Sequence, residues 1–158
     1  MTQAYRGRQR SYSSLKAQLE DWVTETEEAM LTVFVMSVND VIDNAQLPGP
    51  SKSGAGQGGR MRVDTGFLRA SGIGQVGSMP TGPSVKPADA KPGQYNWAND
   101  GVTAALATVK YGDTFYFGWT ANYARYRELY DGFMEASLMQ WGRIVAFNAD
   151  SVRRELKK

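Results

Sequence analysis

The strongest constraint on the fold is a helical pattern over residues 13–44. Apolar and small residues recur there at steps of three and four, which places them on one face of an α-helix: Leu15, Leu19, Trp22, Val23, Met30, Val33, Phe34, Ser37 and Val41. An unbroken helix of this extent would be about 45 Å long. The pattern predicts a long N-terminal helix that ends at Leu47 and Pro48, with a flexible tail at residues 1–12.

A second helical pattern closes the chain. Asp131 and Gly132 precede it, and helical spacing then continues to Leu156 through Met134, Leu138, Trp141, Ile144 or Val145, Asn148 and Val152. The end of this predicted helix is basic, which matches the negative end of a helix dipole. Its cations Arg153 and Arg154 could also contact an acidic partner or DNA.

The middle of the chain predicts a small sheet. Residues 104–110 and 114–119 flank a turn-forming trio and predict a β-hairpin. Ile73 and Val76 predict a weak edge strand or hairpin arm, and residues 64–71 predict a short helix before it. Together with the two long helices, these elements predict an α+β fold with an antiparallel sheet of three to four strands, in one domain over residues 1–158.

Two segments are too rich in turn-forming residues for internal secondary structure. Residues 46–60 are rich in glycine and serine, and residues 79–101 hold four prolines. Long loops of this kind are usually functional. Tyr95 and Trp97 give the second loop an apolar anchor, either on its own domain or on a neighbouring subunit.

Two glycine-rich motifs resemble phosphate-binding loops but lack the required context. Residues 48–59 do not meet the GxxxxGK[ST] spacing, and no strand precedes them. Gly72, Gly74 and Gly77 spell GxGxxG, but a turn with two prolines follows them where a dinucleotide site needs a helix N-terminus. Neither motif predicts a cofactor site.

Composition removes most catalytic chemistries. Cysteine and histidine are both absent, which excludes thiol nucleophiles, thiolate metal sites and histidine-based triads. A carboxylate enzyme around Asp40, Asp43 and Asp64 has no supporting spacing. We therefore expect no enzyme activity, no cofactor and no metal.

No apolar run approaches the roughly 18 residues that a membrane helix needs, and the polar N-terminus carries no export signal. Together with the absence of cysteine, this predicts folding in a reducing cytoplasm.

Charge is segregated along the chain despite a net charge of +2. Residues 17–43 hold seven acids and no Lys or Arg: Glu20, Asp21, Glu25, Glu27, Glu28, Asp40 and Asp43. Basic residues precede and follow this stretch, and four lie in the last six positions of the chain. The pattern suits faces that meet oppositely charged neighbours, although a solvated helix face with basic tails would look the same.

Two segments carry a family resemblance. Val63-Asp64-Thr65-Gly66-Phe67-Leu68-Arg69-Ala70-Ser71 and, further on, Asn122-Tyr123-Ala124-Arg125-Tyr126-Arg127-Glu128 together resemble the minor tail component, or tail-completion, family of siphophages. In that family a VDTGxLRxS box leads into a small sheet, and a YAxxxExG-like box leaves the last strand before a C-terminal helix. One departure follows Glu128, where residues 129–133 stand in place of an early Gly-Thr pair.

The resemblance implies a virion structural protein of the phage neck that is assembled in the host cytoplasm. It would form a hexameric or dodecameric ring, with the hexamer favoured, between connector or stopper proteins and the tail terminator or tube. Genomic DNA would pass through the ring, and Glu20, Asp21, Glu25, Glu27 and Glu28 could line the lumen. The matching motif residues would be structural: Val63, Asp64, Thr65, Gly66, Leu68, Arg69, Ser71, Tyr123, Ala124 and Glu128.

Within the motifs, Arg69 and Glu128 carry opposite charges and could form an ion pair at the helix–sheet junction. Tyr123 and Tyr126 are expected to be core or interface aromatics. The alternative function is a nucleic-acid-binding module that uses its basic tails, although the nearly neutral balance of the domain favours it less.

Overall fold

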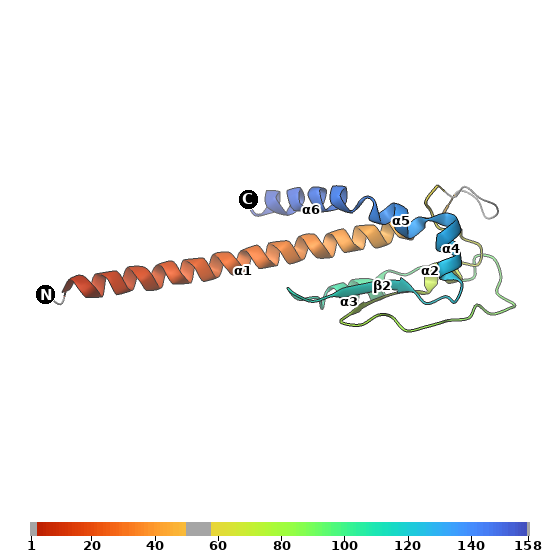
Figure 1. Cartoon of the computed structure of the whole chain (residues 1–158), viewed down its shortest axis with the longest axis horizontal. Helices are drawn as coiled ribbons and strands as arrows, with labels where there is room; N and C mark the ends of the chain where they lie inside the picture. The colour runs from red at the N-terminus through yellow and green to blue at the C-terminus, as the bar shows by residue number, and fades with distance from the viewer. Residues whose placement is uncertain (1–2, 50–57, 158) are drawn as a thin grey trace.

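The computed structural model describes residues 3–49 and 58–157, with side chains from Ser14 onward. In the described chain, a long helix runs along the molecule, helices from the C-terminal part lie on one side of it, and a two-stranded sheet with a short helix lies on the other (Figure 1). The elements in chain order are α1 (Gln3–Ala45), α2 (Phe67–Ala70), β1 (Gly72–Val76), α3 (Asp100–Leu106), β2 (Phe115–Trp119), α4 (Ala124–Asp131), α5 (Phe133–Leu138) and α6 (Trp141–Glu155).

The long N-terminal helix is confirmed, and it starts earlier than the apolar pattern predicts. α1 begins at Gln3, so residues 3–12, which were predicted as a flexible tail, are helical. Residues 1 and 2 lie outside the described residues. Extending an existing helix costs little compared with nucleating one, and residues 3–12 contain no proline to stop it.

The C-terminal half of α1 is packed on the side of the sheet. A core cluster of Ile42, Val102, Leu106 and Val109 joins α1 to α3, and apolar residues of α1 and both strands pack against it. β1 and β2 pair antiparallel, with Gly72 opposite Trp119 and Val76 opposite Phe115. The α+β class is confirmed, but the described sheet has two strands instead of the predicted three to four.

One segment that was predicted as a strand forms part of the helix α3 instead. Residues 104–110 were predicted as the first arm of a hairpin, but α3 covers Asp100–Leu106, and β2 pairs with β1 instead. The segment is rich in alanine, the strongest helix former, and Val102 and Leu106 stand four residues apart on one buried face. Short apolar runs of this kind do not distinguish helix from strand by pattern alone.

The glycines of the GxGxxG sequence belong to β1 and its end. A side chain at Gly72 would meet Gln46 and Trp97, and one at Gly74 would meet the ring of Phe115. These two glycines therefore let large side chains approach the strand backbone. Gly77 has a φ of 79° and ends the strand.

The predicted C-terminal helix is divided. α5 begins at Phe133, directly after Gly132, but it ends at Leu138, and α6 begins at Trp141. α4 precedes both, over residues for which no helix was predicted. Gly132 has a φ of 62° and separates α4 from α5, because a left-handed residue ends an α-helix.

A second core cluster joins the motif segments to α5. It contains Met61, Leu68, Ala121 and Phe133, each less than 5% exposed. A series of edge-to-face ring contacts connects this cluster to the first one, from Trp97 to Phe117 to Trp119 to Phe133, with centroid distances of 6.2, 5.0 and 4.9 Å. The two clusters thus form one continuous interior.

The opposite face of α1 packs on α6 through a polar contact. Asn148 of α6 is buried, and its amide donates to Asp40 Oδ2 at 2.8 Å and to Ser37 Oγ at 3.3 Å. Ser37 is fully buried, so a small side chain lets the two helices approach closely. A hydrogen-bonded group at this depth fixes how α6 lies along α1.

Isolated backbone bridges attach both predicted loops to other parts of the chain. In the loop predicted for residues 46–60, Pro48 and Met61 form an isolated parallel bridge, while residues 50–57 lie outside the described residues. The second loop ends at residue 99, because α3 begins at Asp100. Ser84 in this loop bridges to Ala121 beyond β2. None of the described helices is both long and apolar enough to cross a bilayer.

Replacing Asn148 by alanine should lower the free energy of unfolding by about 1–3 kcal/mol, because the buried Ser37 and the partly buried Asp40 lose their shared donor. Urea denaturation followed by circular dichroism measures the change. Asn96→Ala on the exposed loop is the matched control, and equal stability of the two variants would contradict the assigned role of Asn148.

Candidate functional site

Hydrogen bonds around Ser71 join the first motif segment to the two residues directly before the second motif segment, Thr120 and Ala121. The Ser71 hydroxyl donates to the Leu68 carbonyl at 2.7 Å and accepts from the Ala121 backbone N–H at 3.2 Å. Its carbonyl accepts from the Thr120 N–H at 3.0 Å. This buried serine therefore connects the end of α2 to the residues that lead from β2 into α4.

The loop at residues 93–95 closes over the first motif segment. Gly93 N–H donates to the Asp64 carbonyl and Tyr95 N–H to the Thr65 carbonyl, both at 2.8 Å. The Tyr95 ring meets Phe67 edge to face at 5.2 Å. Gly66 lies beneath, with a φ of 83°, and any side chain on it would overlap the Tyr95 carbonyl oxygen. Only glycine suits this close approach.

Tyr95 and Trp97 both pack on their own chain. Tyr95 lies on Phe67, and the half-buried Trp97 packs against the first core cluster and Phe117. These residues were predicted to dock either on their own domain or on a neighbouring subunit. In the structure, both dock on their own domain.

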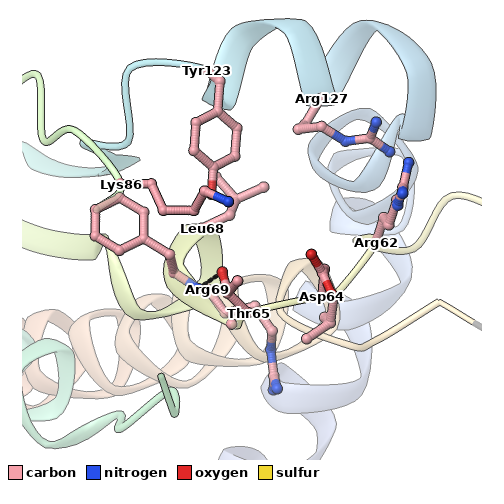
Figure 2. Close-up of a pocket in the computed structure, with 11 residues that line it drawn as sticks. Arg62, Asp64, Thr65, Leu68, Arg69, Lys86, Tyr123 and Arg127 are labelled. Carbon is pink, nitrogen blue, oxygen red and sulfur yellow. Dashed lines mark hydrogen bonds between the residues drawn. The ribbon is translucent and has the colours of Figure 1, made fainter. Parts of the chain in front are cut away.

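A pocket of about 300 Å³ opens between the two motif segments (Figure 2). α2, the segment before it, α4 and the long loop all contribute to the pocket, and its lining is Arg62, Val63, Asp64, Thr65, Gly66, Phe67, Leu68, Arg69, Lys86, Tyr123 and Arg127. In the view of Figure 2, Lys86 and Tyr123 lie on the left, and Arg62 and Arg127 lie on the right. We call this the basic pocket.

Cations outnumber carboxylates in the basic pocket. Arg62, Arg69, Lys86 and Arg127 line it together with a single acid, Asp64. A further carboxylate behind the wall, Asp131, is nearly inaccessible and binds Arg127 through both oxygens, with Nη2 to Oδ1 at 2.6 Å. The Arg62 backbone N–H donates to the same carboxylate at 3.3 Å. Among the described residues, no ion pair neutralises Arg62, Arg69 or Lys86.

Burial shifts the pKa of two side chains in the lining, Arg69 and Tyr123. Within the described chain, the buried Nε of Arg69 has no hydrogen-bond partner, and burial lowers the pKa of its guanidinium. Burial also raises the pKa of the Tyr123 phenol; the charge of Arg127 and a backbone hydrogen bond from Leu68 oppose the shift, and the charge of Asp64 adds to it. A guanidinium with an unused donor favours an anion as its ligand.

Glu128 does not pair with Arg69, so that prediction is wrong. Its carboxylate instead accepts from the backbone N–H groups of Met134 at 3.0 Å and Glu135 at 3.0 Å, at the start of α5. It satisfies donors that a helix N-terminus leaves free. The residues after Glu128 that depart from the family pattern form the last turn of α4 and the corner into α5, which brings those donors to the carboxylate.

The remaining motif residues have structural positions. Thr65 is buried, and its hydroxyl accepts from the Phe67 N–H at 3.3 Å in the turn before α2. Val63 lines the basic pocket, and Ala124 packs against the second core cluster. Tyr126 is 66% exposed and lies outside the core.

The charged residues predicted outside the motifs are all exposed. Glu20, Asp21, Glu25, Glu27 and Glu28 lie on α1, and Arg153 and Arg154 lie in the last turn of α6. Arg153 makes a loose ion pair with Asp150 at 3.9 Å. The structure keeps both sets away from the basic pocket, because they sit along α1 and at the free end of α6 (Figure 1).

Sequence patterns did not identify Arg62, Lys86 and Arg127 as parts of one site. The spacing of Arg127 and Asp131, four residues apart on a helix, was a local signal for their pair. Nothing local marks Lys86, because the path of a long loop brings it to the pocket.

The chemistry available in the pocket is that of hydrogen-bond donors and positive charge. Among residues 3–49 and 58–157, no group of three or more potential ligand side chains could hold a metal ion. The pocket is suited to receive an anionic group, such as a carboxylate or a phosphate. Comparisons with models of known protein families, with curated proteins and with solved structures give no significant match.

Substituting Gly66 with alanine should destabilise the fold by more than about 2 kcal/mol, because the new methyl group meets backbone and the residue is held at positive φ. Gly101→Ala in α3 is the control, since no atom lies within 4 Å of the added group there. Thermal unfolding of both proteins tests the difference, and an unchanged melting temperature for Gly66→Ala would refute the close approach of Tyr95.

Changing Glu128 to alanine should cost about 1–2 kcal/mol of unfolding free energy, because α5 loses the acceptor for two N–H groups. Glu128→Gln keeps one acceptor oxygen and should lose less. Chemical denaturation of both variants measures the order. Equal losses would show that charge, and not helix capping, is what Glu128 supplies.

Proposed function

We propose that this chain is a structural protein of the bacteriophage neck, of the tail-completion or head–tail joining kind, that works by assembling with other protein copies. The observation that carries the proposal is the exposure of apolar side chains on α1. Every residue from 14 to 25 is exposed, including Leu15, Leu19, Trp22 and Val23. This part of α1 extends beyond the rest of the molecule (Figure 1).

Exposed apolar side chains along a helix indicate that another protein packs on it. Isolated helices are marginally stable in water, and most helical stability comes from packing an apolar face. Trp22 is 63% exposed and Leu19 54% exposed, which leaves a large apolar surface in water. Contiguous exposed apolar surface of this kind marks a protein interface.

The apolar surface continues a face that is already used within the chain. Trp22, Thr26 and Val33 of α1 line a hollow together with Val152 of α6 and Leu156, the residue after α6. α6 ends beside this hollow, so the same face of α1 runs on uncovered toward the N-terminus (Figure 1). A helix of another subunit could extend the α1–α6 packing along it.

The proposed assembly is a hexameric or dodecameric ring between connector or stopper proteins and the tail terminator or tube. Residues of both motif segments line the basic pocket, and Ser71 binds Ala121 directly before the second segment, which supports the resemblance to the tail-completion family. Genomic DNA would pass through the ring, and exposed acids of α1 could face it without holding it. The proposed location is the virion neck, after assembly in the host cytoplasm.

A nucleic-acid-binding module is the second candidate. It is supported by the exposed Arg153 and Arg154 at the end of α6 and by the cations of the basic pocket. These groups lie on different parts of the surface, whereas backbone-binding proteins usually gather their cations on one face. Strongly salt-dependent binding of duplex DNA by the purified chain would favour this candidate.

The neck assignment can be tested on virions of the phage that encodes this chain. Antibody-gold labelling should place the protein at the head–tail junction. Infection with a phage carrying a stop codon in its gene should yield separate filled heads and tails, and expression in trans should restore joined particles. Absence of the protein from purified virions would overturn the proposal.

A further inference from the structure

Resting on the proposed function, we infer that the basic pocket of one copy receives the acidic flank of α1 from a second copy. The acidic flank is Glu20 and Glu27. These two residues are seven positions apart, so they lie on nearly the same side of the helix. Both are exposed, and only a loose ion pair at 3.6 Å joins Glu20 to Lys16.

The acidic flank borders the apolar stripe of α1, which is Leu15, Leu19, Trp22, Val23 and Met30. Each residue of this stripe is at least 46% exposed. Helical geometry places Glu20 and Glu27 next to Val23, while Asp21, Glu25 and Glu28 lie roughly 120° further around. The projecting helix therefore presents a mixed surface, apolar with a negative edge.

The basic pocket has the complementary composition. Val63, Phe67 and Leu68 supply apolar walls, and Arg62, Lys86 and Arg69 supply donors. The buried Nε of Arg69 has no hydrogen-bond partner in the described chain. A hollow of about 300 Å³ accommodates an acidic side chain and part of an apolar neighbour. Opposite charges across an interface set orientation and partner choice.

The two surfaces cannot meet within one molecule. The projecting half of α1 and the region of α2 and α4, which forms the pocket, lie at opposite ends of the structure (Figure 1). Contact between them must join two copies head to tail. A head-to-tail contact generates a ring where the rotation closes, which is the assembly proposed for the neck.

A protein ligand fits the pocket better than a nucleic-acid backbone. The apolar walls formed by Val63, Phe67 and Leu68 offer nothing to a sugar–phosphate chain. An acidic helix with apolar neighbours satisfies both parts of the lining. Asp21, Glu25 and Glu28 remain free of this contact and could still face a lumen.

A charge exchange tests the inference. Arg62→Glu with Lys86→Glu, and separately Glu20→Lys with Glu27→Lys, should each weaken self-association of the full chain at least about tenfold, measured by sedimentation over a concentration series. Mixing the two variants, or combining all four changes in one chain, should restore association. Lys91→Glu with Lys110→Glu, at exposed lysines outside the pocket, is the control and should leave it unchanged.

Each contrary result has a defined meaning. A wild-type chain that stays monomeric at all concentrations, or four combined changes that fail to restore association, would overturn the inference. Loss of duplex-DNA binding by Arg62→Glu with Lys86→Glu, without a change in mass, would assign the pocket to phosphate and overturn it as well. Gold labelling at the neck in either case would leave the proposed function standing.

Discussion

The structure depends on α1 being packed from two sides over its C-terminal half. On one side, Ile42 and its neighbours bury the face of α3 and the sheet. On the other side, Ser37 and Asp40 hold Asn148 of α6. A two-stranded sheet is at best marginally stable alone, and so is a helix the length of α6. The sheet and α6 therefore both depend on packing against α1. They lie apart because they pack on opposite faces of that helix.

Residues 14–25 of the same helix are exposed, and this contrast connects the fold to assembly. Where α6 and the sheet end, the apolar side chains of α1 continue into solvent. The free energy that would come from burying Trp22 and its neighbours is not realised within one chain. It is available for a contact with another subunit, and the acids beside the stripe can select which surface makes that contact.

The residues of the motif segments mainly contact backbone groups of other elements. Ser71 connects α2 to the end of β2, Gly66 makes room for the Tyr95 carbonyl, and Glu128 satisfies the first N–H groups of α5. The positive charge of the basic pocket comes partly from residues outside the motifs, such as Arg62 and Lys86. The shape of the pocket is thus a property of the motifs, whereas its electrostatics depend on loop residues that this framework positions.

The sequence alone determined the elements whose signals are local: the long helix α1, the strand β2, the helical character of the C-terminus and the rejection of the GxGxxG sequence as a cofactor loop. Periodicity encodes these because each depends on neighbours within a few turns. Tertiary structure decided the rest. The alanine-rich run at α3 became helical, since Val102 and Leu106 could be buried together on α1. Glu128 met the start of α5 and not Arg69, and Lys86 reached the pocket on a long loop. Such contacts join residues far apart in the chain, so their partners are fixed only when the packed elements bring them together.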